Sequence, residues 1–149
     1  NNSLVWRYLW RSPWLAARIT WGFAARAFER DVGLCRELFF DADASDTEVQ
    51  ALMQKMREGC PAGTRLLDLR ELQRSLPVPA LAGQVPVLVL GGEHDAIVDK
   101  EALDETAAAH GAPAAVILGD VAHDAMLGPR WHQAADAILA WVKGTLPAA

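Results

Sequence analysis

The sequence predicts an α/β protein in which an all-helical region precedes a parallel βαβ unit with a closing helix. Residues 1–77 carry apolar residues at helical spacing between helix start and stop signals. Residues 85–142 instead alternate short apolar runs with longer helical segments, which is typical of βαβ units. Of the 149 residues, 52% are hydrophobic and the net charge is −5, so the chain can form a core and disorder is excluded.

The helical region, residues 1–77, is expected to form three helices. The pair Ser12-Pro13 is a helix start signal, and apolar residues on one face follow it: Trp14, Ala17, Trp21, Ala24 and Phe28. A capping box over 45–48 opens a second helix, which ends at Gly59. A third helix is expected over 64–75, because leucines share one stripe there.

The tryptophan-rich stripe of the first predicted helix has three interpretations. It packs as core against a further domain, it forms a lid over an apolar acyl pocket, or it lies in a membrane interface. Packing is the default, because apolar stripes at helical spacing usually form core. The membrane interpretation requires four arginines to reach lipid headgroups: Arg7, Arg11, Arg18 and Arg26.

A Pro-containing linker over 78–84 leads into the second region, residues 85–149. The apolar run 85–90 ends in Gly91-Gly92, which predicts a strand buried on both faces. A helix over 99–110 closed by Gly111, a second strand over 114–118 and a last helix over 131–142 follow. The last helix carries Ala134, Ile138, Trp141 and Val142 on roughly one side.

Polar side chains follow both predicted strands. The carboxyl ends of parallel strands lie at the same edge of the sheet, where open α/β sheets place their sites. Asp95 follows the first strand and His123 the second, so we expect the two side chains to meet. A carboxylate that binds one ring nitrogen orients the imidazole and stabilises its protonated form, which suits general-base catalysis.

At these residues the sequence resembles the C-terminal part of the α/β-hydrolase superfamily. The segment 85–98 resembles its acid strand and loop, and 122–127, followed by Trp131 and Trp141, resembles its histidine loop and last helix. The helical region is similar to the cap domain of many members. The resemblance implies a partial α/β-hydrolase fold with Asp95 as triad acid and His123 as triad base. It also implies an esterase- or lipase-like serine hydrolase of acyl substrates without cofactor or metal, with Trp21 and Met126 as candidate substrate contacts.

The sequence departs from that family at the nucleophile. Family members carry it in a G-x-S-x-G motif, which this chain lacks. Ser12 and Ser45 are expected to be helix N-caps, and Ser3, Ser75 and Cys60 are not in a suitable context. We therefore expect the chain to be the C-terminal half of a larger hydrolase, with the nucleophile elsewhere. The alternative is a catalytically inactive interaction or scaffold subunit, whose sheet edge a partner covers.

Other functional classes fit the sequence less well. A metal site would draw on the same loops, through His94, Asp95, Asp99, His123 and Asp124, but no paired ligand motif supports it. The acidic balance argues against nucleic-acid binding, and no uncharged apolar run is long enough to span a membrane. Cys35 and Cys60 form neither a disulfide framework nor a metal-ligand pair, which favours an intracellular, reducing compartment.

Overall fold

The computed structural model describes residues 2–59, 83 and 85–145, which form mostly helices and one small sheet. The elements are α1 (Asn2–Arg11), α2 (Pro13–Ala24), the 3₁₀ turn η1 (Ala27–Glu29), α3 (Val32–Phe39), α4 (Asp46–Gly59), β1 (Leu90–Gly92), α6 (Lys100–His110), β2 (Val116–Leu118) and α7 (Trp131–Thr145). The helix predicted over 64–75, Cys60, and the linker 78–84 apart from Gly83 lie outside the described residues.

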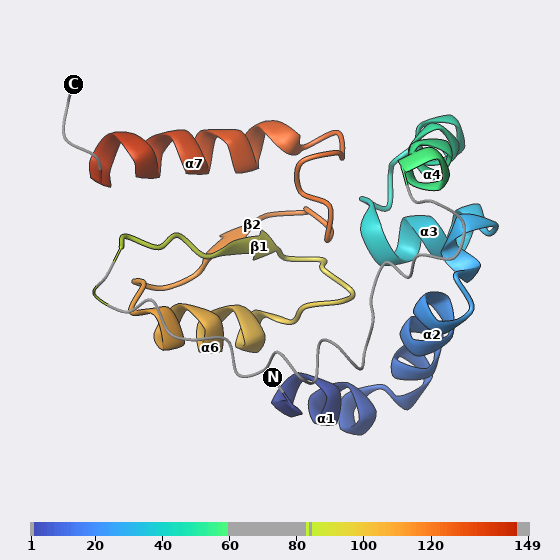
Figure 1. Cartoon of the computed structure of the whole chain (residues 1–149), viewed down its shortest axis with the longest axis horizontal. Coiled ribbons are helices and arrows are strands. Elements are labelled where there is room, and N and C mark those ends of the chain that lie inside the picture. Colours follow the sequence, from blue (N-terminus) through green and yellow to red (C-terminus); the bar gives the residue numbers. More distant parts are fainter. Residues whose placement is uncertain (1, 60–82, 84, 146–149) are drawn as a thin grey trace.

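The two strands lie between two helices. β1 pairs with β2 in parallel, with Leu90 opposite Val116 and Gly92 opposite Leu118. Figure 1 shows α6 and α7 on opposite faces of this sheet, and α1 beside α6. The helices α2 to α4 lie beyond the carboxyl ends of the strands (Figure 1). The helical region therefore faces the loops that follow the strands.

The strands are shorter than the sequence predicts. Pairing is confined to three residues of each strand and one further bond, from the Val116 amide to the Val89 carbonyl at 2.9 Å. Val85 and Pro86 are exposed, so the prediction of a strand buried on both faces is wrong for this part. The reason is that a strand needs neighbours. No third strand lies beside β1 among the described residues, and Pro86 has no amide proton to donate.

Three of the predicted helix boundaries are confirmed by their caps. Ser12 accepts a hydrogen bond from the Leu15 amide at 3.4 Å, and α2 begins at Pro13. The capping box before α4 is reciprocal, since the Ser45 amide donates to Glu48 and the Glu48 amide donates back to the Ser45 hydroxyl. α6 ends at Gly111, whose φ of +67° is the left-handed conformation that favours glycine.

The main hydrophobic core lies in the helical region. Its buried members come from η1, α3, α4 and the segment after α3: Phe28, Leu34, Cys35, Leu38, Phe39, Phe40, Ala44, Val49 and Met53. The partly buried Phe23 packs against this core, and the rings of Phe23, Phe28 and Phe39 contact one another at centroid distances of 5.3–5.9 Å. Ile97, in the loop after β1, also packs on this core, so the helical region holds that loop directly.

The tryptophan stripe does not form core among the described residues. Trp14 and Trp21 are exposed, and α2 instead buries Ala16 and Gly22. Gly22 lets the Leu38 side chain approach closely, since a Cβ atom at position 22 would lie 2.9 Å from Cδ1 of Leu38. The helix ends at Ala24, and Arg26 adopts a left-handed φ of +51°, so the buried Phe28 belongs to η1 and not to α2. The tryptophans of this stripe are therefore uncovered within the described chain, and their packing against a further domain stays a prediction.

A smaller core lies between the sheet and α7. Its buried members are Leu118, Val121, Ala125 and Ala134. Ile138 of the same helix is exposed, so only part of its predicted apolar side is covered. Among the described residues, no helix combines the length and apolarity needed to cross a membrane.

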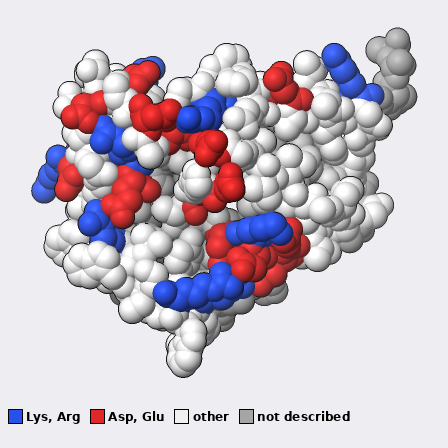
Figure 2. Space-filling view, turned by 180° about the vertical axis from the view of Figure 1, so that it is seen from behind, with Lys and Arg blue, Asp and Glu red and all other residues white. Residues whose placement is uncertain are grey.

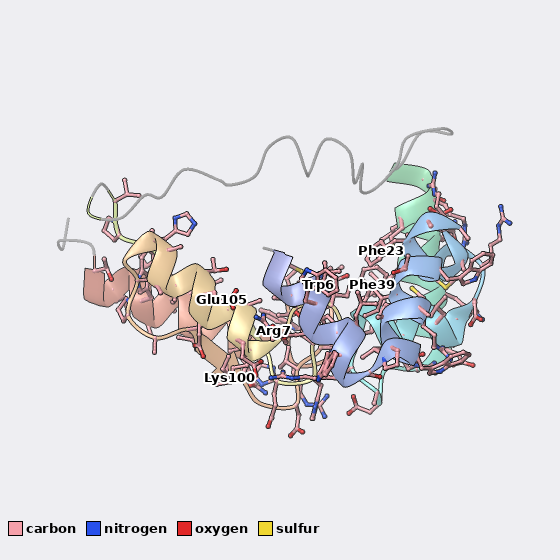
Figure 3. All side chains as sticks on the ribbon, turned by 90° about the horizontal axis from the view of Figure 1, so that it is seen from below. Trp6, Arg7, Phe23, Phe39, Lys100 and Glu105 are labelled. Atoms are coloured by element: carbon pink, nitrogen blue, oxygen red, sulfur yellow. The ribbon has the colours of Figure 1, made fainter. Side chains whose placement is uncertain are left out.

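Charged side chains of both signs are interleaved on the surface. Figure 2 shows acidic and basic groups side by side on one face, without a patch of one sign. Arg7 of α1 contacts both Asp99 and Glu105 at 2.7 Å, which fastens α1 to α6 (Figure 3). Arg11 pairs with Glu101 in the same interface. The arginines of α1, Arg7 and Arg11, are therefore paired with carboxylates at α6.

Candidate active site

Asp95 lies in the loop after β1 and its carboxylate is held on both oxygens. Oδ1 accepts hydrogen bonds from the amides of Ile97 at 2.7 Å and Val98 at 2.9 Å. Oδ2 lies 2.8 Å from Nδ1 of His123. The side chain is only 5% exposed. Asp95 is thus a buried carboxylate with a fixed orientation toward one imidazole.

His123 lies in the loop after β2, and the structure brings it to Asp95 as the strand order predicts. A carboxylate only accepts here, so Nδ1 carries the proton, and Nε2 is the nitrogen that can take up a proton. The ring is 31% exposed and packs near Phe39, at a centroid distance of 6.1 Å. The hydrogen bond to Asp95 raises the pKa of His123 above its ordinary value, although burial acts in the opposite direction.

The two loops are joined by backbone hydrogen bonds beyond the end of the sheet. The Glu93 amide donates to the Leu118 carbonyl, and the His94 amide donates to the Val121 carbonyl, both at 2.9 Å. This contact requires glycine at position 92, because a Cβ atom there would lie 2.1 Å from the Val121 carbonyl oxygen. These backbone bonds hold the two loops together next to Asp95 and His123.

The segment after α3 contacts the histidine loop on both sides of His123. The Asp124 amide donates to the Phe39 carbonyl, and the Ala122 amide donates to Oδ1 of Asp41, both at 2.8 Å. Sequence reasoning missed Asp41. A single acidic residue directly after the apolar run 38–40 was the available signal, but nothing in the sequence indicated its partner 81 residues away.

Asp124, next to His123, is a half-buried carboxyl group. Burial raises its pKa, while the neighbouring His123 acts to lower it. The Asp95–His123 pair therefore has a second acidic group close by, which favours a positive charge on the imidazole.

The two predicted substrate contacts do not line the two cavities described below. Trp21 is 65% exposed on α2, and Met126 is 66% exposed in the loop after His123. Met126 was expected to line a pocket or the core. It lies instead on the surface, because Val121 and Ala125 of the same loop occupy the space under α7.

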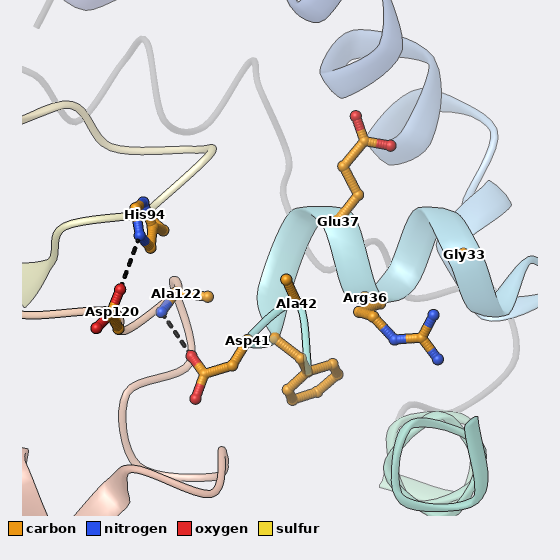
Figure 4. A pocket seen from close by; sticks show the side chains of 9 residues that line it. Gly33, Arg36, Glu37, Asp41, Ala42, His94, Asp120 and Ala122 are labelled. Carbon is orange, nitrogen blue, oxygen red and sulfur yellow. Dashed lines mark hydrogen bonds and ion pairs between the residues drawn. The ribbon is translucent and has the colours of Figure 1, made fainter. Parts of the chain in front are cut away.

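Two cavities flank the seam between the helical region and the sheet. One of about 370 Å³ lies between α3 and the loops after the strands, and Arg36, Asp41, His94 and Asp120 contribute to its walls (Figure 4). Another of about 410 Å³ lies between α4 and the segment before α7. Neither is lined by Asp95 or His123.

Of the five residues considered for a metal site from the sequence, His94 alone lies in a group of possible metal ligands in the described part of the chain. Asp95 binds His123, and Asp99 binds Arg7 and the first turn of α6. The three ligand atoms within 4.8 Å of one another in the described part of the chain belong to Glu93, His94 and Asp120, all of which are exposed. Figure 4 shows the His94–Asp120 contact of 3.3 Å within this group.

Ser12, Ser45 and Cys35, which the structure describes, have other roles than that of a nucleophile. Ser12 and Ser45 cap helices, as predicted. Cys35 is fully buried, and burial raises the pKa of its thiol to about 11, so it is not a thiolate near neutral pH. Ser75 and Cys60 lie outside the described residues.

Comparisons with protein-family models, curated proteins and solved structures found no match to this chain.

Proposed function

We propose that Asp95 and His123 are the acid and base of a Ser-His-Asp hydrolase of the α/β-hydrolase type. The observation that carries this proposal is the hydrogen bond of 2.8 Å between Nδ1 of His123 and a buried carboxylate at the carboxyl end of the neighbouring strand. A His–Asp contact can also be purely structural. Here, however, the carboxylate is fixed by two amides and the ring stays partly exposed, which is the arrangement a general base needs.

In this proposal the substrate is an ester or related acyl compound, and the nucleophilic serine lies outside these 149 residues. The serine oxygen attacks the acyl carbon while its proton moves to Nε2 of His123. The imidazolium, stabilised by Asp95, then protonates the leaving alkoxide. Water attacks the acyl-enzyme in the same way, and the serine recovers its proton. The helical region would act as the cap, because it faces the strand ends.

The test is phosphonate labelling of the intact protein. A fluorophosphonate forms a bond to the serine oxygen as fluoride leaves, and this reaction needs the general base. We expect His123→Ala to abolish labelling and Asp95→Asn to lower kcat by about 10⁴-fold, as loss of the acid does in such triads. His132→Ala is the matched control, since that histidine is exposed at the start of α7. Unchanged labelling and turnover in both site variants would remove the assignment.

The 149-residue chain alone gives a second measurement. It supplies acid and base but no G-x-S-x-G serine. Its hydrolysis of a p-nitrophenyl ester is therefore expected not to exceed that of free imidazole at the same concentration. Clear turnover that His123→Ala abolishes would show that the nucleophile lies within this chain.

The second candidate function is a non-enzymatic interaction subunit. One observation favours it: α1 turns an apolar face to the solvent, with Val5, Trp6, Leu9 and Trp10 exposed, while Arg7 on the other face contacts α6. Exposed apolar patches of this kind mark interaction surfaces. If this candidate is correct, the intact protein takes up no phosphonate, and Trp10→Glu changes its sedimentation while His123→Ala does not.

A further inference from the structure

Asp41 is a buried carboxylate outside the Asp95–His123 pair. Among the described residues it is the most deeply buried charged residue, with 4% of its surface exposed. A buried charge is costly unless it is paired and hydrogen-bonded. Asp41 follows α3 and lies against the histidine loop, so groups in its surroundings must pair with it and bond to it.

Asp41 and Phe39 together hold the backbone on both sides of His123. Its Oδ1 accepts the amide of Ala122 at 2.8 Å, and the carbonyl of Phe39, two residues earlier, accepts the amide of Asp124 at the same distance (Figure 4 shows the first). These are the amides immediately before and after His123. The backbone on both sides of the histidine is thus fastened to one three-residue segment, 39–41.

The carboxylate is itself held from two further directions. Nη1 of Arg130 donates to its Oδ2 at 3.1 Å and to Asp43 at 2.8 Å. Gly128 lies against it, so closely that a Cβ atom there would be 3.0 Å from Oδ2. The guanidinium offsets the buried charge, and the glycine leaves the space that the carboxylate occupies.

We propose that Asp41 is a positioning residue for His123: it fixes the histidine loop so that Nδ1 stays within hydrogen-bond distance of Asp95. With both flanking amides held, the imidazole is adjusted only by rotation of its own side chain, and the Phe39 ring limits that rotation. Asp41 contacts Ala122 and not the ring, so it acts through the loop. The value of this device for catalysis rests on the proposed function.

The test is the state of His123 in the 149-residue chain, measured by NMR with Asp41→Ala. The groups facing His123 are the carboxylates of Asp95 and Asp124 and the ring of Phe39. We expect the variant to lose the downfield Nδ1–H signal of His123, and the pKa of His123 to fall toward its ordinary value. A variant that stays folded by circular dichroism and keeps both the signal and the pKa would overturn the proposal.

Asp43→Asn is the matched control, because it removes the exposed partner of Arg130 and leaves the Asp41–Ala122 bond. It is expected to keep the Nδ1–H signal. Equal loss in Asp43→Asn would show that the arginine network in general, and not Asp41, holds the loop.

If Asp41→Ala does not fold, Gly128→Ala decides the question. The added methyl group presses on the Asp41 carboxylate, so the Nδ1–H signal is expected to weaken and exchange faster with water. Gly144→Ala, which meets nothing within 4 Å, is its control. An unchanged His123 signal in a folded Gly128→Ala chain would contradict the proposal. These readouts need no enzyme activity, so they are independent of whether the intact protein is a hydrolase.

Discussion

Arg7 and Asp99, which are 92 residues apart, form a two-point ion pair. Nε and Nη2 of the guanidinium donate to the two carboxylate oxygens, each at 2.7 Å. Asp99 is also the N-cap of α6, because its Oδ1 accepts the Ala102 amide at 2.9 Å. The Asp99 carboxylate thus caps the N-terminus of α6 and also binds α1 to that helix.

Asp99→Ala is expected to destabilise the chain by about 1–2 kcal/mol, the usual cost of a lost N-cap. Arg7 holds the pKa of Asp99 below its ordinary value. The stability from this group is therefore present above the unfolded pKa and is lost as the pH falls through the folded pKa. Urea unfolding at several pH values measures both effects. Asp104→Asn, which removes an exposed pair with Lys100, is the control and is expected to change little.

The Asp95–His123 pair predicts the opposite pH dependence. The folded-state pKa of His123 is raised, so the stability that the protonated imidazole contributes is complete below the unfolded pKa and is lost as the pH rises through the folded pKa. His123→Gln is therefore expected to cost more stability at about pH 5.5 than at about pH 8.5. Urea unfolding of both chains at the two pH values measures this, with His132→Gln as reference. An equal cost at both values would argue against the charged pair.

Gly92→Ala is expected to unfold the sheet end. The new Cβ atom would lie 2.1 Å from a backbone oxygen, which cannot rotate away as a side chain can. The cost is at least that of severe overpacking, about 3 kcal/mol. Gly144→Ala in α7 is expected to be neutral or stabilising by up to about 1 kcal/mol, because helix propensity favours alanine. Thermal unfolding of the two variants makes the comparison, and similar melting temperatures would contradict the strand contact.

Cys35 is expected to be unreactive in the folded chain. Its thiol is fully buried, and this burial is the main cause that raises the pKa of the thiol to about 11. In a Cys60→Ser chain, Ellman's reagent should react with no thiol in buffer and with one thiol per chain in denaturant. Rapid reaction under native conditions would mean that the α3–α4 core opens readily.

Much of the local structure follows from the sequence. The caps at Ser12, Ser45 and Gly111 mark helix ends because they act within one turn, between residues that are close in the chain. The order of the two strands likewise predicted that Asp95 and His123 would meet, since parallel strands end at one edge. The helices α1 and α3 have weaker end signals, and their separate existence was not predicted.

Other features depend on contacts between distant segments. The stripe on α2 predicted an apolar face, but periodicity does not say which neighbour covers it. Within the described chain α2 packs through Gly22 against Leu38, and Trp14 and Trp21 stay exposed. The strands were predicted too long, because apolar composition does not reveal how many neighbouring strands are present.

The sequence by itself determined the helix boundaries at Ser12, Ser45 and Gly111, and that an acid and a histidine follow successive strands, since these depend on residues a few positions apart. Only the tertiary structure decided that Asp41 binds the amide beside His123, and that Arg130 compensates its charge. The physical reason is that a buried carboxylate is stable only when groups from elsewhere in the chain neutralise and bond to it, and no local pattern encodes such partners.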